Sequence, residues 1–235
     1  MFAIFKREMK GYFTGALGYV FLVMFLAVAA VVFAYTTLFA MTANVTGYFT
    51  VMLLFSAIAL PVLTMKSFSE ERKMKTEQLL LTSPVSIPGM VIGKFLASYA
   101  MYAGALLFTS LYFLLLIPYA PINFALLFGN ITALLLVGMV FITIGLFVSA
   151  LTENQLSAAV GTFAIILAFL GIGLLSTLLP EKYWLRFVLE ALSILSRFQN
   201  LTAGFFELSS FVYYLSVSGV FIYFTMRIYD RRRYN

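Results

Sequence analysis

Residues 89–95, GMVIGKF, have the residue types of a nucleotide-binding loop. In such a loop four residues separate the two glycines, and a Ser or Thr after the lysine ligates magnesium. Here three residues separate Gly89 from Gly93, and Phe95 follows Lys94. We therefore do not expect this segment to bind or hydrolyse ATP. Lys94 is interpreted instead as an anchor whose amine extends to the membrane surface at the start of an apolar run.

Other catalytic and metal chemistry is also largely excluded. The sequence has no cysteine and no histidine, which removes disulfides, thiolate metal sites, cysteine nucleophiles and the usual proton shuttle at neutral pH. A charge at the centre of a bilayer costs about 2.5–3.5 kcal/mol, and apart from Lys94 the apolar runs carry none. Glu153 lies in a short link and is interpreted as a solvated cap. We expect no catalytic residue, no metal and no cofactor in this chain, and no coupling through a buried carboxylate.

The segment 71–86, ERKMKTEQLLLTSPVS, is the most polar stretch outside the two ends of the chain. Ser67 and Glu70 have the spacing of a capping box, and Pro84 marks a stop, so the sequence predicts a short helix from Phe68 to Thr82. A favourable pair of opposite charges at i and i+4, Glu71 and Lys75, supports this helix.

The charges of this predicted helix explain why it stays in water, but its run of leucines, residues 79–81, requires a partner surface or the membrane edge. Two interpretations follow from the pattern. The helix is either a solvated connector or a lever that a soluble partner moves.

The elements around this segment are predicted to lie in a membrane. Of the 235 residues 63% are hydrophobic and 10% charged, and the mean hydropathy is +1.03, whereas soluble proteins have about 45–50% apolar and about 25% charged residues. Spanning the hydrocarbon takes about 20 apolar residues. Six runs meet this requirement, so residues 1–235 are predicted to form one all-α integral membrane domain with six transmembrane helices: 16–40, 48–65, 90–117, 124–151, 156–179 and 211–226. The first run is longer than the apolar part of a signal peptide, about 7–15 residues, and is expected to be retained.

The positive charges predict the orientation. Twelve of the 15 lysines and arginines lie before the first run, in or beside the link 66–88, or after the last run. By the positive-inside rule, both termini and this link are cytoplasmic, and the localisation is a multi-pass protein of the inner or plasma membrane. The basic residues lie beside apolar runs and form no aromatic-basic module, so no nucleic acid is expected as a partner.

Two segments are predicted to lie along the membrane. Residues 1–14 place apolar side chains at spacings of three and four, with Lys6, Arg7 and Lys10 elsewhere on the helical wheel, as in an interfacial amphipathic helix. Residues 180–210 contain the only tryptophan and several aromatic residues. They are interpreted either as short re-entrant helices in the outer leaflet or as a small extracellular cap.

Small residues follow one face of two runs. Such a seam lets helices approach closely where no hydrophobic effect drives their association. A shorter seam, Gly138, Gly145 and Ser149, lies in the fourth run and is expected to pack within the chain. The seam of the fifth run fits packing within the chain and a dimer interface equally well; it consists of Ser157, Gly161, Ala164, Ala168 and Gly171.

Three segments carry a resemblance to a known family. FSEERKMKTEQLLLTSPVSIPGMVIGKFLAS resembles the cytoplasmic loop of type-2 ABC exporter permeases, with an acidic residue, Thr-Glu, a double leucine, Pro-Val-Ser and Gly-Lys-Phe at similar spacing. LTENQLSAA and SRFQNLTAGFFELSSFVYYLSV, with the terminal RRRY, are similar to later parts of the same family, especially its gliding-motility and nitrous-oxide-reductase-maturation branch. The sequence departs from the pattern at Lys75, where glycine is usual, at Arg197, where histidine is common, and at Ser209 and Ser210, near usual acidic positions.

The resemblance implies a permease subunit of an ATP-driven exporter. It implies a coupling helix between the second and third spans, re-entrant helices before the sixth, and a homo- or heterodimer in membrane lipid with two ABC ATPase subunits, which bind the ATP and magnesium. The residues that would contact the ATPase are Glu70, Glu71, Arg72, Thr76, Glu77, Leu79 and Leu80. Closure of the ATPase subunits would move the coupling helix and rearrange spans one, two and five.

Two other functions stay open from the residues alone. One is a channel or secondary transporter that works without an ATPase, and the other is a membrane scaffold that holds an ATPase complex.

Overall fold

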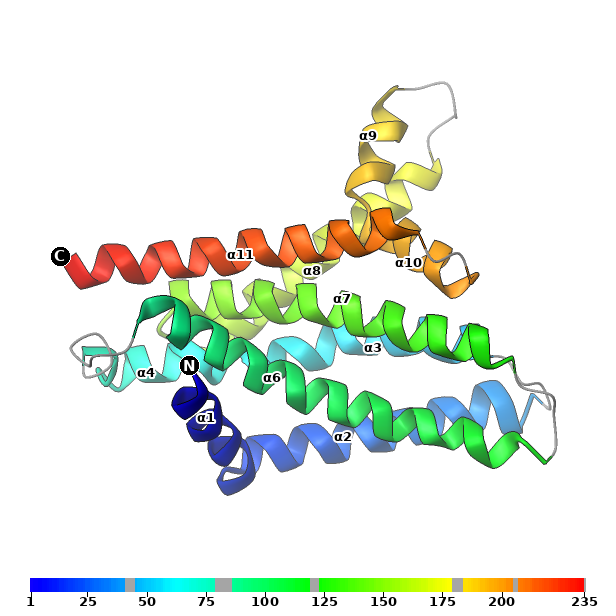
Figure 1. The fold of residues 1–235 in the computed structure, drawn as a ribbon, viewed down its shortest axis with the longest axis horizontal. Coiled ribbons are helices and arrows are strands. Elements are labelled where there is room, and N and C mark those ends of the chain that lie inside the picture. The colour runs from blue at the N-terminus through cyan, green and yellow to red at the C-terminus, as the bar shows by residue number, and fades with distance from the viewer. Residues whose placement is uncertain (41–44, 79–85, 119–122, 179–183, 205–206, 235) are drawn as a thin grey trace.

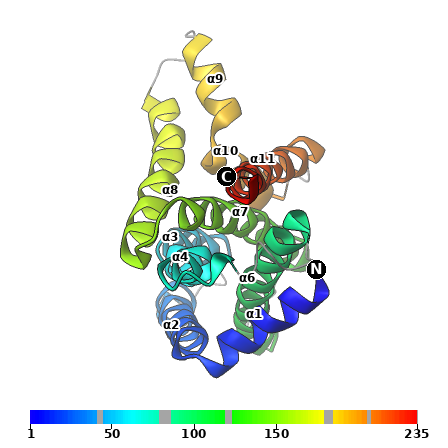
Figure 2. The same ribbon diagram turned by 90° about the vertical axis from the view of Figure 1, so that its left-hand side faces the viewer.

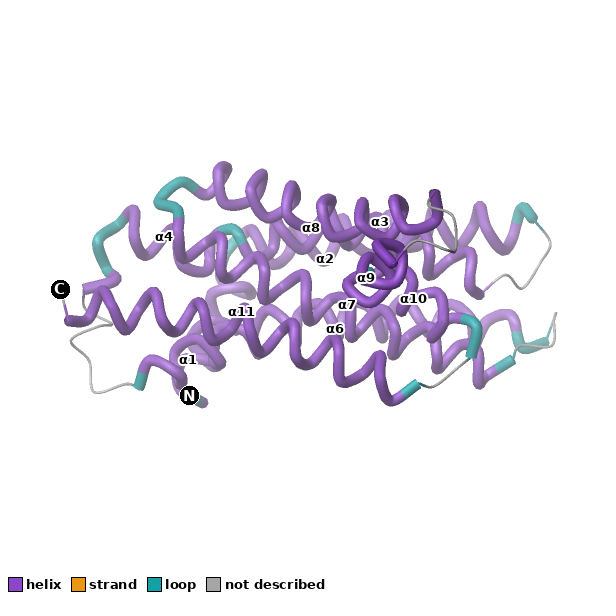
Figure 3. The backbone as a smooth tube through the Cα atoms, turned by 90° about the horizontal axis from the view of Figure 1, so that it is seen from above, coloured by secondary structure: helices purple, strands orange, loops and turns teal. Residues whose placement is uncertain are grey.

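The computed structural model describes residues 1–40, 45–78, 86–118, 123–178, 184–204 and 207–234. This described part of the chain is helical and contains no strand. Six of its helices are long and apolar enough to cross a membrane, which confirms the predicted number of spans. They run alongside one another in a single bundle (Figures 1 and 3).

The helices have the following bounds. The first half of the chain forms α1 (Phe2–Thr14), α2 (Ala16–Phe33) with the π-helical turn η1 (Ala34–Leu38), α3 (Val45–Thr64), α4 (Lys66–Lys73), and α6 (Ile87–Ser110) with the 3-10 turn η2 (Leu111–Leu116). The second half forms α7 (Phe124–Leu151), α8 (Gln155–Leu178), α9 (Trp184–Leu192), α10 (Ile194–Thr202) and α11 (Leu208–Tyr234).

Helix α7 is the centre of the bundle and packs against α3, α6, α8, α10 and α11. In its most apolar window 72% of the residues are buried, compared with 22% for α11. Its small residues explain this close packing, because a Cβ at Gly138 would lie 2.0 Å from the Tyr102 ring and one at Gly145 2.1 Å from Thr64 Oγ1. The seam of the fourth span therefore packs within the chain.

Helix α2 contributes one aromatic face to the bundle. Phe21, Phe25 and Phe33 are buried at intervals of four and eight residues. The Phe25 ring lies 5.9 Å from that of Tyr102, and the Phe33 ring 5.3 Å from that of Phe113. Exposed valines lie on the opposite face, as expected for a helix in contact with lipid.

The two termini and α4 lie toward the same end of the bundle (Figure 1). There α1 crosses the direction of the long helices, as the view along the bundle shows (Figure 2). The shared end agrees with the expectation that both termini and the link 66–88 face one side of the membrane. That this side is the cytoplasm stays a prediction from the charges.

Two short helices, α9 and α10, lie between the fifth and sixth spans. Helix α9 projects from the side of the bundle (Figure 1) and exposes Trp184 and Phe187. Helix α10 is held to α11 because Arg197 stacks on the Tyr213 ring at 4.5 Å and Tyr214 donates a 2.9 Å hydrogen bond to the carbonyl of Ile194. Two short helices fit the interpretation of this region as re-entrant helices, but whether they enter a membrane or form an extracellular cap stays a prediction.

Candidate functional site

Helix α4 is almost a direct continuation of α3, since only Met65 separates them. Its start is fixed by Ser149 of α7, whose Oγ accepts the N–H groups of Phe68 and Ser69 at 3.1 Å each. The same hydroxyl donates to the Met65 carbonyl at 3.1 Å. The predicted capping box does not form, because α4 begins one residue before Ser67 and has no side-chain cap. A side chain distant in sequence satisfies these N–H groups instead.

Helix α4 ends at Lys73, so the prediction of a continuous helix from Phe68 to Thr82 is wrong. The break lies at Lys75, which has a left-handed backbone with φ of 57°. Helices often end in this way, usually on a glycine, because other residues pay a steric penalty there. In the resembled family this position is usually glycine. That family pattern was the sequence signal that the helix ends here.

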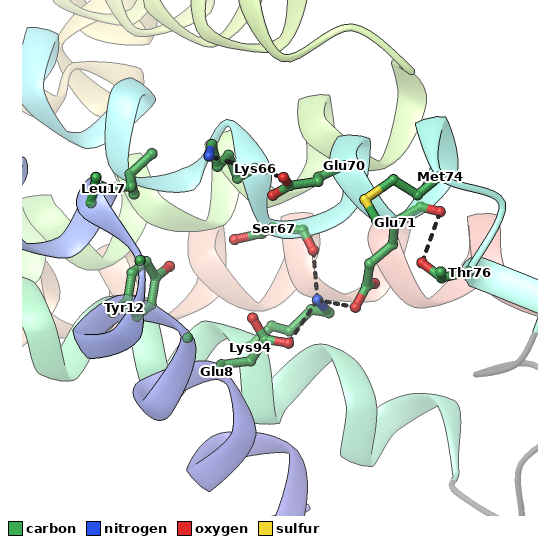
Figure 4. A pocket seen from close by; sticks show the side chains of 13 residues that line it. Glu8, Tyr12, Leu17, Lys66, Ser67, Glu70, Glu71, Met74, Thr76 and Lys94 are labelled. Atoms are coloured by element: carbon green, nitrogen blue, oxygen red, sulfur yellow. Dashed lines mark hydrogen bonds and ion pairs between the residues drawn. The ribbon is translucent and has the colours of Figure 1, made fainter.

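An ion cluster joins α4 to α1 and α6, and we call Arg7, Glu8, Glu71 and Lys94 the ion cluster. Figure 4 shows three of its members, Glu8, Glu71 and Lys94. The Lys94 side chain is only 1% exposed, and its Nζ lies 3.0 Å from Glu8 Oε1 and 2.9 Å from Glu71 Oε1. It also donates to the carbonyl of Ser67 at 2.5 Å. Lys94 is therefore not a snorkelling anchor, because its amine points into the protein.

Arg7 completes the ion cluster. Its Nη2 lies 2.7 Å from Glu8 Oε1 and 2.8 Å from Glu71 Oε1, so two cations face two carboxylates. Glu71 thus pairs with α1 and α6, and not with Lys75 in its own segment as the sequence predicted. The local pattern missed this because the partners lie 64 and 23 residues away along the chain.

The electrostatics keep Glu8 ionised. Burial by itself would raise the pKa of the Glu8 carboxyl, but the charge of Lys94 and hydrogen bonds from Arg7 and Lys94 outweigh it, so the pKa lies below its usual range. Burial would likewise lower the pKa of Arg7, and its bonds to Glu8 and Glu71 raise it instead. Glu8 and Arg7 are therefore both charged at neutral pH.

The glycines of the GMVIGKF segment allow α1 to reach this position. A Cβ at Gly93 would lie 3.1 Å from both Ile4 Cγ2 and the Met1 carbonyl oxygen. One turn further along α6, Ser98 Oγ lies 2.9 Å from the hydroxyl of Tyr12. These glycines thus form a packing surface for α1.

Two arginines tie α4 and α11 to the carboxyl end of α7. Arg72 donates to the Leu151 carbonyl at 2.7 Å and lies 3.0 Å from Glu153. Arg232 of α11 donates to the Ala150 carbonyl at 2.8 Å, and its other nitrogen lies 2.9 Å from Glu77. Carbonyls at a helix end lack partners within the helix, and cations near them are favourable. These contacts join α4, Glu77 and α11 to the carboxyl end of α7.

The expected ATPase-contact residues therefore divide into two groups. Glu71, Arg72 and Glu77 bind other parts of the chain, and Thr76 donates to the Glu71 carbonyl at 3.2 Å. Glu70 is 40% exposed and pairs only loosely with Lys66, at 3.9 Å. Leu79 and Leu80 lie outside the described residues.

The outer surface of the segment is the turn that follows α4. Lys73, Met74 and Lys75 are exposed, and Met74 is a large apolar side chain with 64% of its surface accessible. Beside them a cavity of about 450 Å³ opens between α4 and the corner of α1 and α2, lined among others by Leu17, Glu70 and Met74 (Figure 4). Met74 was not predicted from the sequence, because a single apolar residue in a polar segment has no apolar neighbours at helical spacing that would mark a contact surface.

The seam of the fifth span lies on the outside of the bundle. Ser157, Ala164 and Ala168 of α8 are exposed, and Gly161 and Gly171 are half-buried. A Cβ at Gly171 would meet no atom of the described chain within 4 Å. The single chain thus leaves this seam largely uncovered.

A metal site is not evident in the described ranges, which hold no group of three or more metal-ligating His, Cys, Asp or Glu side chains. The family model described as "ABC-2 family transporter protein" matches residues 38–232, from the last residue of η1 to the last turn of α11. No curated protein gives a significant match to the chain.

Proposed function

Because the chain belongs to the ABC-2 family of transporter proteins, whose members are the multi-pass permeases of ABC transporters and work with ABC ATPases, we propose that α4 is its coupling helix. In this proposal separate ATPase subunits bind ATP and magnesium, and their closure moves α4. The observation that carries it is the ion cluster, which joins α4, at the end of the bundle that holds both termini (Figure 1), to α1 and α6.

The contacts of α4 support a role as a rigid lever. Lys94 of α6 lies 2.9 Å from Glu71 and donates to the Ser67 carbonyl, so a charge pair and a hydrogen bond attach α4 to α6. The Ser149 hydrogen bonds and the Arg72 contact hold the same helix to α7. A push on α4 would therefore move α1, α3, α6 and the end of α7 together.

We assign the docking surface to the exposed turn and its neighbours. Lys73, Met74 and Lys75 offer two cations around one apolar side chain, and Glu70 is the accessible acid beside them. In this assignment Glu71, Arg72 and Glu77 transmit force within the permease. Thr76, Leu79 and Leu80 stay in the proposed contact surface as the resemblance implies.

The complete transporter is proposed to contain two permease subunits and two ATPase subunits. The α8 seam is the proposed contact between permeases, in a homodimer or a heterodimer, because it is small-residue, apolar and uncovered in the single chain. The charge distribution supports cytoplasmic termini and a cytoplasmic α4, in the inner or plasma membrane. In this arrangement α1 lies along the cytoplasmic membrane surface, and α9 and α10 are the re-entrant region.

The proposed cargo is an amphipathic or apolar molecule that is exported. Apart from Lys94, which is already paired, the six apolar runs of the sequence carry no charge that would replace the hydration of a small ion. The sequence similarity favours the gliding-motility and nitrous-oxide-reductase-maturation branch.

The test is co-purification with candidate ABC ATPases from the same organism. Met74→Asp with Lys75→Glu, and Glu70→Lys with Leu80→Asp, are expected to abolish association. Arg233→Glu, an exposed charge reversal elsewhere at the same end, should leave association intact. Unchanged binding by both double variants would refute the docking role of this segment.

Coupling needs a separate measurement. The chain has no native cysteine, so spin labels at Lys73→Cys and Phe128→Cys report one distance between α4 and the far end of α7. ATP binding by the assembled complex is expected to change this distance, and Lys94→Met to reduce the change. If ATP never changes this distance, the coupling role is refuted and the alternative function, a membrane scaffold for the ATPase, is supported.

A further inference from the structure

A groove between α7 and α11 opens near the end of the bundle that holds both termini. Its volume is about 510 Å³, and its apolar lining comes from Phe147 and Leu151 of α7 and from Tyr223 and Phe224 of α11. Leu151, Tyr223 and Phe224 are all exposed. The groove thus presents an aromatic surface outside the bundle.

Two arginines stand over this groove. Arg227 and Arg231 are one helical turn apart on α11, both line the groove, and both are exposed. Neither forms an ion pair with a carboxylate in the ranges that the structure describes. They differ in this from Arg232, which is held by Glu77 and the Ala150 carbonyl.

The position of the arginines identifies the chemistry of the ligand. They follow the apolar part of a candidate span, where the hydrocarbon gives way to the headgroup layer. A guanidinium binds a phosphate oxygen through paired, charge-assisted hydrogen bonds, and two guanidinium groups one turn apart can share one phosphate. The aromatic groove beside them has the surface that an acyl chain covers.

We propose that the groove between α7 and α11 binds an anionic phospholipid, with Arg227 and Arg231 on the headgroup phosphate and one acyl chain against Phe147, Tyr223 and Phe224. Basic pockets between spans at a membrane surface bind anionic headgroups in this way. The site is independent of ATPase docking, because none of its residues belongs to the α4 segment or the ion cluster. A free phosphate would use the arginines alone and leave the groove empty.

The test is native mass spectrometry of the purified full chain, titrated with phosphatidylglycerol or with phosphatidylcholine of the same acyl chains. Phosphatidylglycerol is expected to bind the parent more tightly than phosphatidylcholine. Arg227→Gln with Arg231→Gln should weaken phosphatidylglycerol about 30-fold, roughly fivefold for each arginine. The matched control, Arg233→Gln with Lys73→Gln, removes the same charge from exposed positions outside the groove and should change binding less than about twofold.

Two further arms separate the headgroup from the chain. Phe224→Ala is expected to weaken both lipids, and excess inorganic phosphate is expected not to displace phosphatidylglycerol. If the control variant loses as much affinity for phosphatidylglycerol as the Arg227 and Arg231 variant, the lipid is attracted diffusely to the positive charge of the helix end, and the proposal is overturned. Displacement by inorganic phosphate, or equal affinity for the two lipids, would also overturn it.

Discussion

Lys94→Met tests the ion cluster most directly. Methionine keeps the length and apolar stem of lysine but removes the amine that lies between Glu8 and Glu71. The two carboxylates, 19% and 18% exposed, would then have only Arg7 as a partner in the ion cluster. Phe68 would also lose a cation 4.9 Å from its ring centre.

The size of the effect follows from burial. Because Lys94 is 1% exposed, its loss falls in the range for breaking a buried pair, about 3–5 kcal/mol of unfolding free energy. Arg7 is 47% exposed, so Arg7→Gln should cost only about 1 kcal/mol. Glu8→Gln and Glu71→Gln added to Lys94→Met remove the unpaired charges and should recover most of the loss, as replacing a whole buried pair often does.

The assay uses Ile4→Cys, a buried position on α1 in a chain without other cysteines. Maleimide labelling of this thiol in detergent measures how often α1 leaves the bundle, and thermal melting gives the global stability. Labelling should rise strongly in Lys94→Met, slightly in Arg7→Gln, and return toward the parent in the triple variant. If Lys94→Met costs no more than Arg7→Gln, the ion cluster does not hold α1 and α4 together.

The remaining predictions concern single positions. Gly138→Ala should lower the unfolding free energy by about 1–3 kcal/mol, and with it the melting temperature, because the added Cβ overpacks against Tyr102. The matched control is Gly104→Ala, which should be neutral or stabilising because its Cβ meets no atom of the described chain within 4 Å. Lys75→Gly should stabilise the protein by about 1 kcal/mol, measured by melting, because glycine adopts the left-handed backbone without strain; a loss of stability would contradict this. Because the pKa of Glu8 is lowered on folding, its contribution to stability is present above the unfolded pKa, about 4.3, and is lost as the pH falls through the folded value. The melting temperature of the parent should therefore lose more between neutral pH and acid than that of Glu8→Gln, with the difference appearing only below the unfolded pKa; a difference that already disappears near neutral pH would contradict this.

Local patterns predicted the spans well. Each apolar run is contiguous in sequence, and a helix satisfies its own backbone in lipid, so the number of spans follows without knowledge of their partners. The small residues of α7 also predicted close packing, and Gly138 and Gly145 provide it.

The candidate site was predicted only in part. The resemblance placed the coupling segment at Glu70–Leu80, but periodicity extended its helix past Lys75, since a charge pair within one helix looked favourable. The partners of Lys94 could not be predicted, because Glu8 and Glu71 lie on separate helices whose contact depends on tertiary packing.

The ion cluster also limits how this sequence can drift over evolutionary time. A lone change at Lys94 leaves Glu8 and Glu71 with Arg7 alone, and a lone change at Glu71 leaves the buried Lys94 with a single carboxylate, so each single step passes through a weakened protein. Related chains that abandon the lysine are therefore expected to have exchanged both acids as well, and positions 8, 71 and 94 should be inherited as one unit.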